Sequence, residues 1–191
     1  SIAAPAVAGT VALMLQANPG LTPPLIKAIL QYTAQPLPGA RIVQQGAGSL
    51  NVDGAVRVAK ALRTDIASAI VAGTLKPGDN LLASGATLPS PTSVINGETV
   101  NWSRVVFAGG GHVFSGPALF QKYQGFYDPR VVWAGNWVRF YNPVYWWSSP
   151  SNRYMRYVLE SQPVTGGLVS SGVVSANALA GSSSLLSSTG I

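Results

Sequence analysis

The sequence lacks cysteine, and it is poor in charged residues and in long apolar runs. Without cysteine, its 191 residues offer neither a disulfide framework nor a thiolate metal site. Only 9% of the residues are charged, against about a quarter in an average soluble domain. No apolar run approaches the roughly 18 residues that a membrane-spanning helix needs, so no transmembrane segment is predicted.

Acidic residues are also scarce, which leaves a formal net charge of +6. The 12 lysines and arginines are scattered and form no basic stripe, so nucleic-acid binding is not predicted. The 21 glycines, 14 prolines and many serines give a polar but uncharged surface that suits an exported protein, and we expect secretion. The chain opens at Ser1 inside a helical pattern, so we expect a fragment or a processed product, with any export signal upstream.

Residues 3–17 form the first strongly apolar segment of the chain. Its residues are mostly small, and Pro5 stands in the first turn, where a missing N–H is tolerated. The Asn-Pro-Gly sequence at residues 18–20 stops the pattern. Because apolar residues occur on every side, the sequence predicts a helix that is buried all round.

Two further helices are predicted, at about residues 23–34 and 52–62. Thr22 is the candidate N-cap of the first and Asn51 of the second, and the first is expected to pack on the helix at 3–17. The expected apolar faces are formed by Leu25, Ile29 and Tyr32 in one helix and by Val52, Val56, Ala59 and Leu62 in the other.

Composition changes along the rest of the chain. All five tryptophans, all five phenylalanines and six of the seven tyrosines lie at residues 102–157, in short β-branched and aromatic runs that predict strands. We therefore expect a catalytic-type domain part at 1–64, a linker at 65–93, an aromatic β-rich extension at 94–165 and a Gly/Ser-rich tail of degenerate repeats at 166–191.

The opening residues SIAAPAVAGTVALMLQANPGLT carry the most specific motif. They resemble the nucleophile segment of the subtilase family, in which a Gly-Thr-Ser turn leads into a helix that begins Ser-Met-Ala-Ala-Pro. Ile2 stands where the family usually has Met, and the preceding Gly-Thr lies outside the sequence. The matching residues are Ser1, Ala3, Ala4, Pro5, Val7, Ala8 and Gly9.

Two more segments strengthen the resemblance because they follow in the family's order and spacing. Residues 21–34 resemble a helix with a Thr-Pro start and a Thr-Ala end, and residues 46–52 resemble the closing Gly-x-Gly-x-Leu-Asn signature. About a third of the chain is covered. The resemblance implies an α/β fold, of which this chain holds the C-terminal helical part without most of the central sheet, followed by a small β-rich extension.

The resemblance also implies a chemistry. Ser1 matches the nucleophile of a serine endopeptidase that cleaves polypeptides, and a helix N-terminus beside it would favour the oxyanion. The family's Asp and His precede its serine, so both partners are expected upstream, and the isolated chain is expected to be inactive. No cofactor or metal site is expected here, although the resemblance allows structural calcium in the parent enzyme.

Other residues with reactive side chains have simpler interpretations. His112, the only histidine, follows a glycine triplet and is interpreted as a loop residue. Asp53 and Asp79 suit a helix face and a turn, Glu98 suits a hairpin-like turn, and Asp65 stands alone. None pairs with a second carboxylate at metal or glycosidase spacing.

Three alternatives stay open at this point. In one alternative Ser1 is an ordinary N-cap, a position that favours serine. In another it is an N-terminal nucleophile that uses its own α-amine as base. Residues 94–160 present Trp, Tyr and Arg that suit a noncatalytic surface- or carbohydrate-binding module, although packing within the extension is favoured. The region at 92–127 is similar to the C-terminal extensions of some bacterial subtilases, a less specific likeness.

Overall fold

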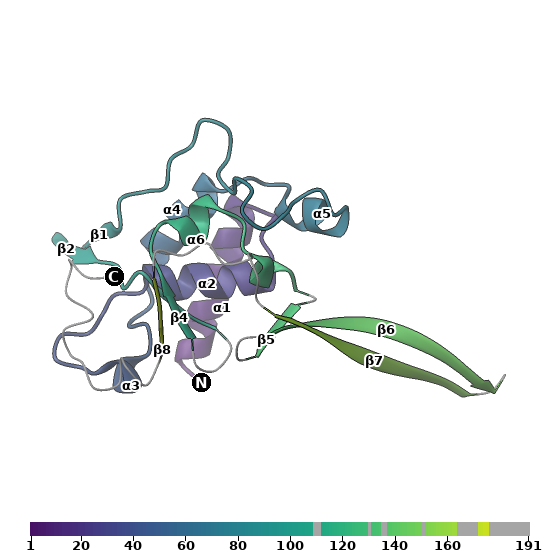
Figure 1. Cartoon of the computed structure of the whole chain (residues 1–191). Helices are drawn as coiled ribbons and strands as arrows, with labels where there is room; N and C mark the ends of the chain where they lie inside the picture. Colours follow the sequence, from purple (N-terminus) through teal and green to yellow (C-terminus); the bar gives the residue numbers. More distant parts are fainter. Residues whose placement is uncertain (109–111, 130, 135–136, 150–151, 164–171, 176–191) are drawn as a thin grey trace.

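The computed structural model describes residues 1–108, 112–129, 131–134, 137–149, 152–163 and 172–175, with side chains at 1–107 and 113–129. The described residues form a mixed α/β structure with six α-helices and three small antiparallel sheets (Figure 1). The helices are α1 (Ala3–Ala17), α2 (Pro23–Thr33), α3 (Ile42–Gln45), α4 (Val52–Ala61), α5 (Ile66–Val71) and α6 (Ala118–Gln121), with a 3-10 turn η1 at Gly125–Tyr127. No described helix is long and apolar enough to cross a membrane.

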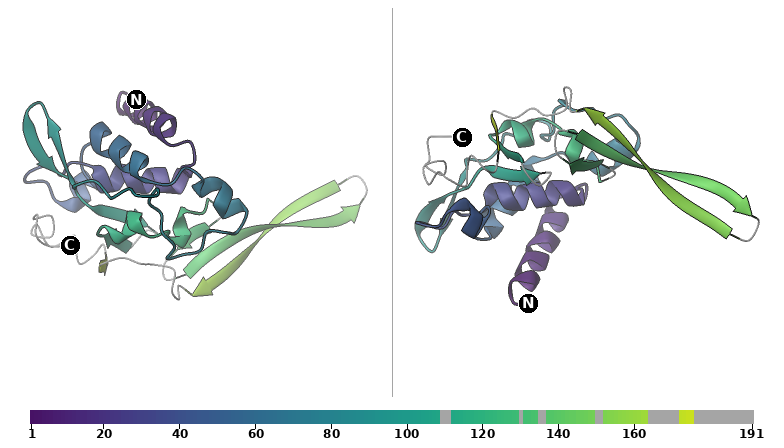
Figure 2. Two further views of the ribbon diagram at one scale, coloured as in Figure 1. Left: turned by 90° about the horizontal axis from the view of Figure 1, so that it is seen from above. Right: turned by 60° about the horizontal axis from the view of Figure 1, so that its bottom comes forward.

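Helix α1 has the predicted bounds but not the predicted burial. Of its 15 residues only Thr10 and Met14 are buried, whereas Leu13 and Leu15 are 47% and 39% exposed. The expectation of a helix buried on all sides is therefore wrong within this chain. The physical reason is the lack of a partner, because α4 is the main described element that packs against α1 and no described sheet covers its remaining sides. Figure 2 shows α1 projecting from the rest of the helices and crossing α2 steeply.

Helix α2 is buried as its spacing predicted. Leu25, Ile29 and Tyr32 are each at most 2% exposed. Thr22 takes the N-cap position with extended backbone, but its side chain makes no capping hydrogen bond. Its hydroxyl instead donates to the carbonyl oxygen of Tyr127 at 2.6 Å, so the predicted cap is a tertiary contact.

Helix α4 joins α1 and α2, and α2 does not pack mainly on α1 as expected. Its predicted cap is confirmed, since the Asn51 side chain accepts from the N–H of Gly54 at 3.0 Å. The apolar face is rotated from the prediction, because Val52 is 40% exposed. The residues of α4 and its C-cap that are buried are Gly54, Ala55, Val58, Ala59, Ala61 and Leu62.

One hydrophobic core runs from α1 to η1. Residues 66–81, expected as linker, contribute helix α5 and the buried Ile66 and Leu81 to the same cluster as α2 and α4. Whether 1–64 and 94–165 are separate domains stays a prediction. The aromatic region contacts α2, since the Tyr32 ring lies 6.2 Å from that of Trp102 and 4.7 Å from that of Phe120, centroid to centroid.

The strands form hairpins rather than one large sheet. Strands β1 (Thr92–Ile95) and β2 (Glu98–Asn101) make a hairpin, and β3 (Val105–Ala108), β4 (His112–Ser115) and β8 (Gly172–Ser175) make the second sheet. The third sheet contains β5 (Val131–Ala134), β6 (Trp137–Ser149) and β7 (Asn152–Pro163), and β6 and β7 project as a long ribbon (Figures 1 and 2). The predicted strands of the aromatic region are thus present, and residues 116–127 contain α6 followed by η1. Most of the predicted tail lies outside the described residues.

Candidate functional site

The N-terminal edge of α1 holds Ser1, the residue that the sequence marks as a candidate nucleophile. Ser1 is exposed and lies two residues before Ala3, where the helix begins. Between them Ile2 takes the N-cap position, with φ −82° and ψ −36°, and makes no side-chain capping bond. The first N–H groups of a helix have no partner within it, so the positive end of the α1 dipole lies beside Ser1.

The far end of α1 is held firmly to α4 by Asn18, a fully buried residue. Its side-chain amide donates to the carbonyl oxygens of Ala59 at 2.9 Å and Leu62 at 3.2 Å, and its oxygen accepts from the N–H of Gly20 at 3.0 Å. A Cβ on Gly20 would lie 2.0 Å from the carbonyl oxygen of Thr64, so only glycine fits this approach. The C-terminal end of α1 is fixed in place, while its Ser1 end is exposed.

A polar cluster around the buried Ser93 holds the start of α4 against the region that follows it. The hydroxyl of Ser93 accepts from the Trp102 indole at 2.9 Å and from the Asn51 amide at 3.1 Å, and donates to the Asp53 carboxylate at 2.7 Å. A Cβ on Gly54 would lie 2.9 Å from the Trp102 ring, so glycine permits this packing. This cluster joins the segment with the subtilase-like motifs to β1 and Trp102.

The candidate acidic residues have structural partners. Asp53 bonds Ser93 and lies 3.3 Å from Arg57, in agreement with its expected place on a helix face. Asp79 accepts from the backbone N–H of Lys76 at 2.7 Å, which confirms the expected turn. The expectation that Asp65 stands alone is wrong, since Arg63 bonds it at 2.6 Å and this bond lowers the pKa of the Asp65 carboxyl.

The only histidine is not placed as expected. His112 begins strand β4, paired with Ala108 and Ser175, so its interpretation as a loop residue is wrong. The β-branched and aromatic residues after it form a strand that extends back to include it. Its side chain lies outside the described part of the chain. Among the side chains that are described, none hydrogen-bonds to the hydroxyl of Ser1.

Two buried tyrosines do not supply a base either. Burial raises the pKa of Tyr32, although the Arg104 guanidinium acts in the opposite direction, and burial raises the pKa of Tyr127 well above its ordinary value. Both phenols are therefore neutral at physiological pH. The Tyr127 hydroxyl donates to the carbonyl oxygen of Leu119, which fixes η1 against α6.

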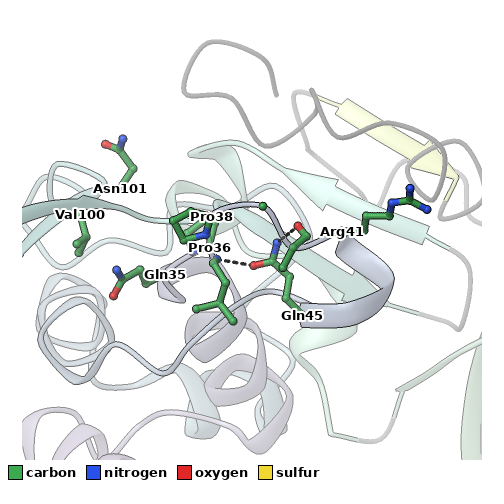
Figure 3. A pocket seen from close by; sticks show the side chains of 10 residues that line it. Gln35, Pro36, Pro38, Arg41, Gln45, Val100 and Asn101 are labelled. Atoms are coloured by element: carbon green, nitrogen blue, oxygen red, sulfur yellow. Dashed lines mark hydrogen bonds between the residues drawn. The ribbon is translucent and has the colours of Figure 1, made fainter.

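A pocket of about 440 Å³ lies beside α3, at a loop for which the sequence predicted no site (Figure 3). Gln45 holds the loop from within: its side-chain oxygen accepts from the N–H of Leu37 and its amide donates to the carbonyl oxygen of Ala40, both at 2.6 Å. The sequence signal that could have found it is the pair of glutamines at 44 and 45. The lining consists of Gln35, Pro36, Leu37, Pro38, Gly39, Ala40, Arg41, Gln45, Val100 and Asn101.

Comparison with known families gives one match. Residues 1–57 match the family model described as "Subtilase family". This segment contains α1, α2, α3 and the first residues of α4, with Ser1 at its start. Searches of curated proteins and of solved structures returned no match. The match supports the resemblance to a subtilisin-like fragment that the opening residues show.

Proposed function

We propose that Ser1 is the nucleophile of a secreted endopeptidase, because residues 1–57 match the subtilase family model. The chain would be the C-terminal part of that enzyme, and its substrate an extended polypeptide. One observation carries the proposal: the matched segment begins with a serine at the N-terminal edge of a helix of small residues.

The proposed reaction assigns one step to this chain. The Ser1 hydroxyl attacks the scissile carbonyl carbon while an upstream His takes its proton, and an upstream Asp orients that His. The C–N bond of the substrate breaks as the His returns the proton to the leaving amine, and water then hydrolyses the acyl-enzyme. The N–H groups at the start of α1 favour the oxyanion that forms during each attack.

The exposed surface of α1 supports the proposal that another part of the parent enzyme packs against it. Gly9 lies in mid-helix, where glycine costs about 1 kcal/mol relative to alanine, yet a Cβ there would meet nothing within 4 Å among the described residues. Gly20 and Gly54, by contrast, each face an atom that a Cβ would strike. In the proposed enzyme, upstream residues that pack closely against α1 would explain why a glycine occupies position 9.

The alternatives have less support. An N-terminal nucleophile uses its own α-amine at the start of a strand, whereas Ser1 leads into helix α1. A surface-binding role for residues 94–160 requires exposed aromatic side chains. The described Trp102, Phe120 and Tyr127 are buried, and the side chains of the other four tryptophans lie outside the described residues. No observation favours either over the protease.

The proposal is tested in the proposed parent enzyme, by Ser1→Ala. Hydrolysis of casein should fall by roughly 10⁴-fold or more, since triad members act as a unit. The matched control is Ser49→Ala, which removes another exposed serine hydroxyl from the same matched segment. Circular dichroism checks that both variants fold. Full turnover in Ser1→Ala would assign the nucleophile elsewhere.

A further inference from the structure

The ribbon of β6 and β7 leaves the outer edge of β7 open. Among the described strands β7 pairs with β6 alone, and β5 pairs with β6 only at residues 137–140. Beyond those residues the two strands project from the rest of the molecule without a third described strand beside them (Figures 1 and 2). A two-stranded ribbon is marginally stable in water, so a further strand on the open edge of β7 would stabilise it.

The composition of β7 suits pairing along that edge. Its only proline is Pro163 at the very end, and it contains neither glycine nor lysine. Residues 154–159 are Tyr-Met-Arg-Tyr-Val-Leu, in which aromatic and β-branched types favour a strand. Charged residues protect an edge against pairing, and β7 carries Arg153, Arg156 and Glu160. Pairing therefore depends on the charges that a partner strand places opposite these three residues.

A second copy of the chain supplies the matching charges. In an antiparallel pair about a two-fold axis, residues opposite each other lie on the same face of the sheet, and successive residues of one strand alternate between the faces. Arg156 and Glu160 occupy even positions of β7 and share a face, whereas Arg153 occupies an odd position. Arg156 can therefore lie opposite Glu160 of the second copy, and the two-fold axis makes the same pair twice.

That charge pair fixes the register of the whole strand. Val158 then lies on the two-fold axis opposite Val158 of the second copy, and Arg153 lies opposite the uncharged Pro163, so no like charges oppose each other. A register centred on Tyr157 would leave the charges unpaired, and one centred on Arg156 would place two arginines opposite each other. The register centred on Val158 is therefore favoured over both.

We propose that two copies of this chain associate by antiparallel pairing of β7 with β7 of the second copy, centred on Val158. The two three-stranded sheets then form one continuous six-stranded sheet, and two Arg156–Glu160 pairs lie across the interface. The partner is a second copy because β7 carries both members of the charge pair at the spacing that the two-fold axis requires. The association does not involve Ser1, so its test is independent of the proposed protease.

Charge reversal tests the pairing in the full 191-residue chain, by sedimentation equilibrium over a range of concentrations. The unsubstituted chain should be a dimer. Arg156→Glu or Glu160→Arg places like charges opposite each other at two points and should raise the dissociation constant about tenfold or more. The matched control is Arg153→Glu, which makes the same charge change opposite an uncharged residue and should leave the dissociation constant unchanged.

A mixture of the two weakened variants separates lost pairing from a damaged fold. When an Arg156→Glu chain meets a Glu160→Arg chain, both pairs across the interface again have opposite charges. The mixture should therefore recover the dissociation constant of the unsubstituted chain to within about threefold. A mixture as weak as the separate variants would overturn the proposal. A dimer that charge reversal does not weaken, or a chain that stays monomeric at its highest soluble concentration, would overturn it as well.

A single introduced cysteine tests the register, because the chain has none of its own. Val158→Cys would place two thiols opposite each other where the Cα atoms of an antiparallel pair lie about 4.5–5.5 Å apart, within disulfide range. Oxidation with copper–phenanthroline should then give a covalent dimer. The control is Tyr154→Cys on the same face of β7, whose two thiols would lie roughly 27 Å apart and should not cross-link. Equal cross-linking of the two variants would overturn the proposed register.

Discussion

Helices α1 and α2 are both rich in apolar residues, but the chain buries them very differently. Helix α2 buries six of its 11 residues, and α1 buries two of its 15. Helix α2 lies among α4, β3 and η1, whereas α1 has α4 as its main described partner. An apolar sequence therefore predicts that a helix is stabilised by burial, but the helix is buried only where a packing partner is present.

The contrast has a functional side. Ser1 stands at the exposed end of the helix that lacks its partners, and Asn18 anchors the other end. In the proposed enzyme, upstream chain would cover α1 and bring the base to Ser1 in one step. The described part of the chain supplies a positioned helix and a candidate nucleophile, and neither of its catalytic partners.

The largest expected effect comes from truncating equivalent leucines in the two helices. Leu25→Ala in α2 removes a side chain that is 0% exposed and should cost about 3 kcal/mol of unfolding free energy. Leu13→Ala in α1, where the leucine is 47% exposed, should cost about 0.5 kcal/mol or less. Urea unfolding followed by circular dichroism measures both. Equal losses of unfolding free energy would mean that a further element covers α1 in solution.

A smaller effect is expected from the residue that holds α1 in place. Asn18→Ala leaves the buried carbonyl oxygens of Ala59 and Leu62 without this donor and should cost about 2 kcal/mol. Gln16→Ala, a truncation at an exposed position of the same helix, is the control and should change stability by less than about 0.5 kcal/mol. If both variants unfold at the same urea concentration, α1 is not anchored through Asn18.

The smallest effect separates a tertiary hydrogen bond from a local one. Thr22→Val removes the 2.6 Å bond to Tyr127 and leaves a buried carbonyl, at a cost of about 1–2 kcal/mol. Thr10→Val in α1 removes a bond to the carbonyl oxygen of Ala6, four residues earlier in the same helix, and should cost less. Thermal unfolding of the pair would contradict the comparison if Thr10→Val proved the more damaging change.

The sequence predicted local structure well where the determinants are local. The bounds of α1, the buried spacing of α2 and the cap at Asn51 follow from periodicity and from side-chain bonds within a few residues. The exposure of α1, the bond from Thr22 to Tyr127 and the continuous core through residues 66–81 depend on contacts between distant segments. Periodicity within one segment carries no information about such contacts.

The candidate sites divide in the same way. The opening motif marked Ser1, and the family match over residues 1–57 supports the resemblance, while its role as nucleophile stays a prediction. The pocket beside α3 was missed because its walls come from the loop that precedes α3, from Gln45 and from Val100 and Asn101, which only the folded chain brings together. His112 was misplaced because the pairing of β4 with β3 and β8 extends the strand to include it.

The most direct test of the account is the reactivity of Ser1 in residues 1–191 expressed alone. A serine hydroxyl is a weak nucleophile at neutral pH unless a base lies within about 2.6–3.2 Å. The chain should therefore show no turnover of casein and no stoichiometric labelling by a fluorophosphonate probe. Stoichiometric labelling that Ser1→Ala abolishes would contradict the account, because it would show that these residues hold a complete catalytic site.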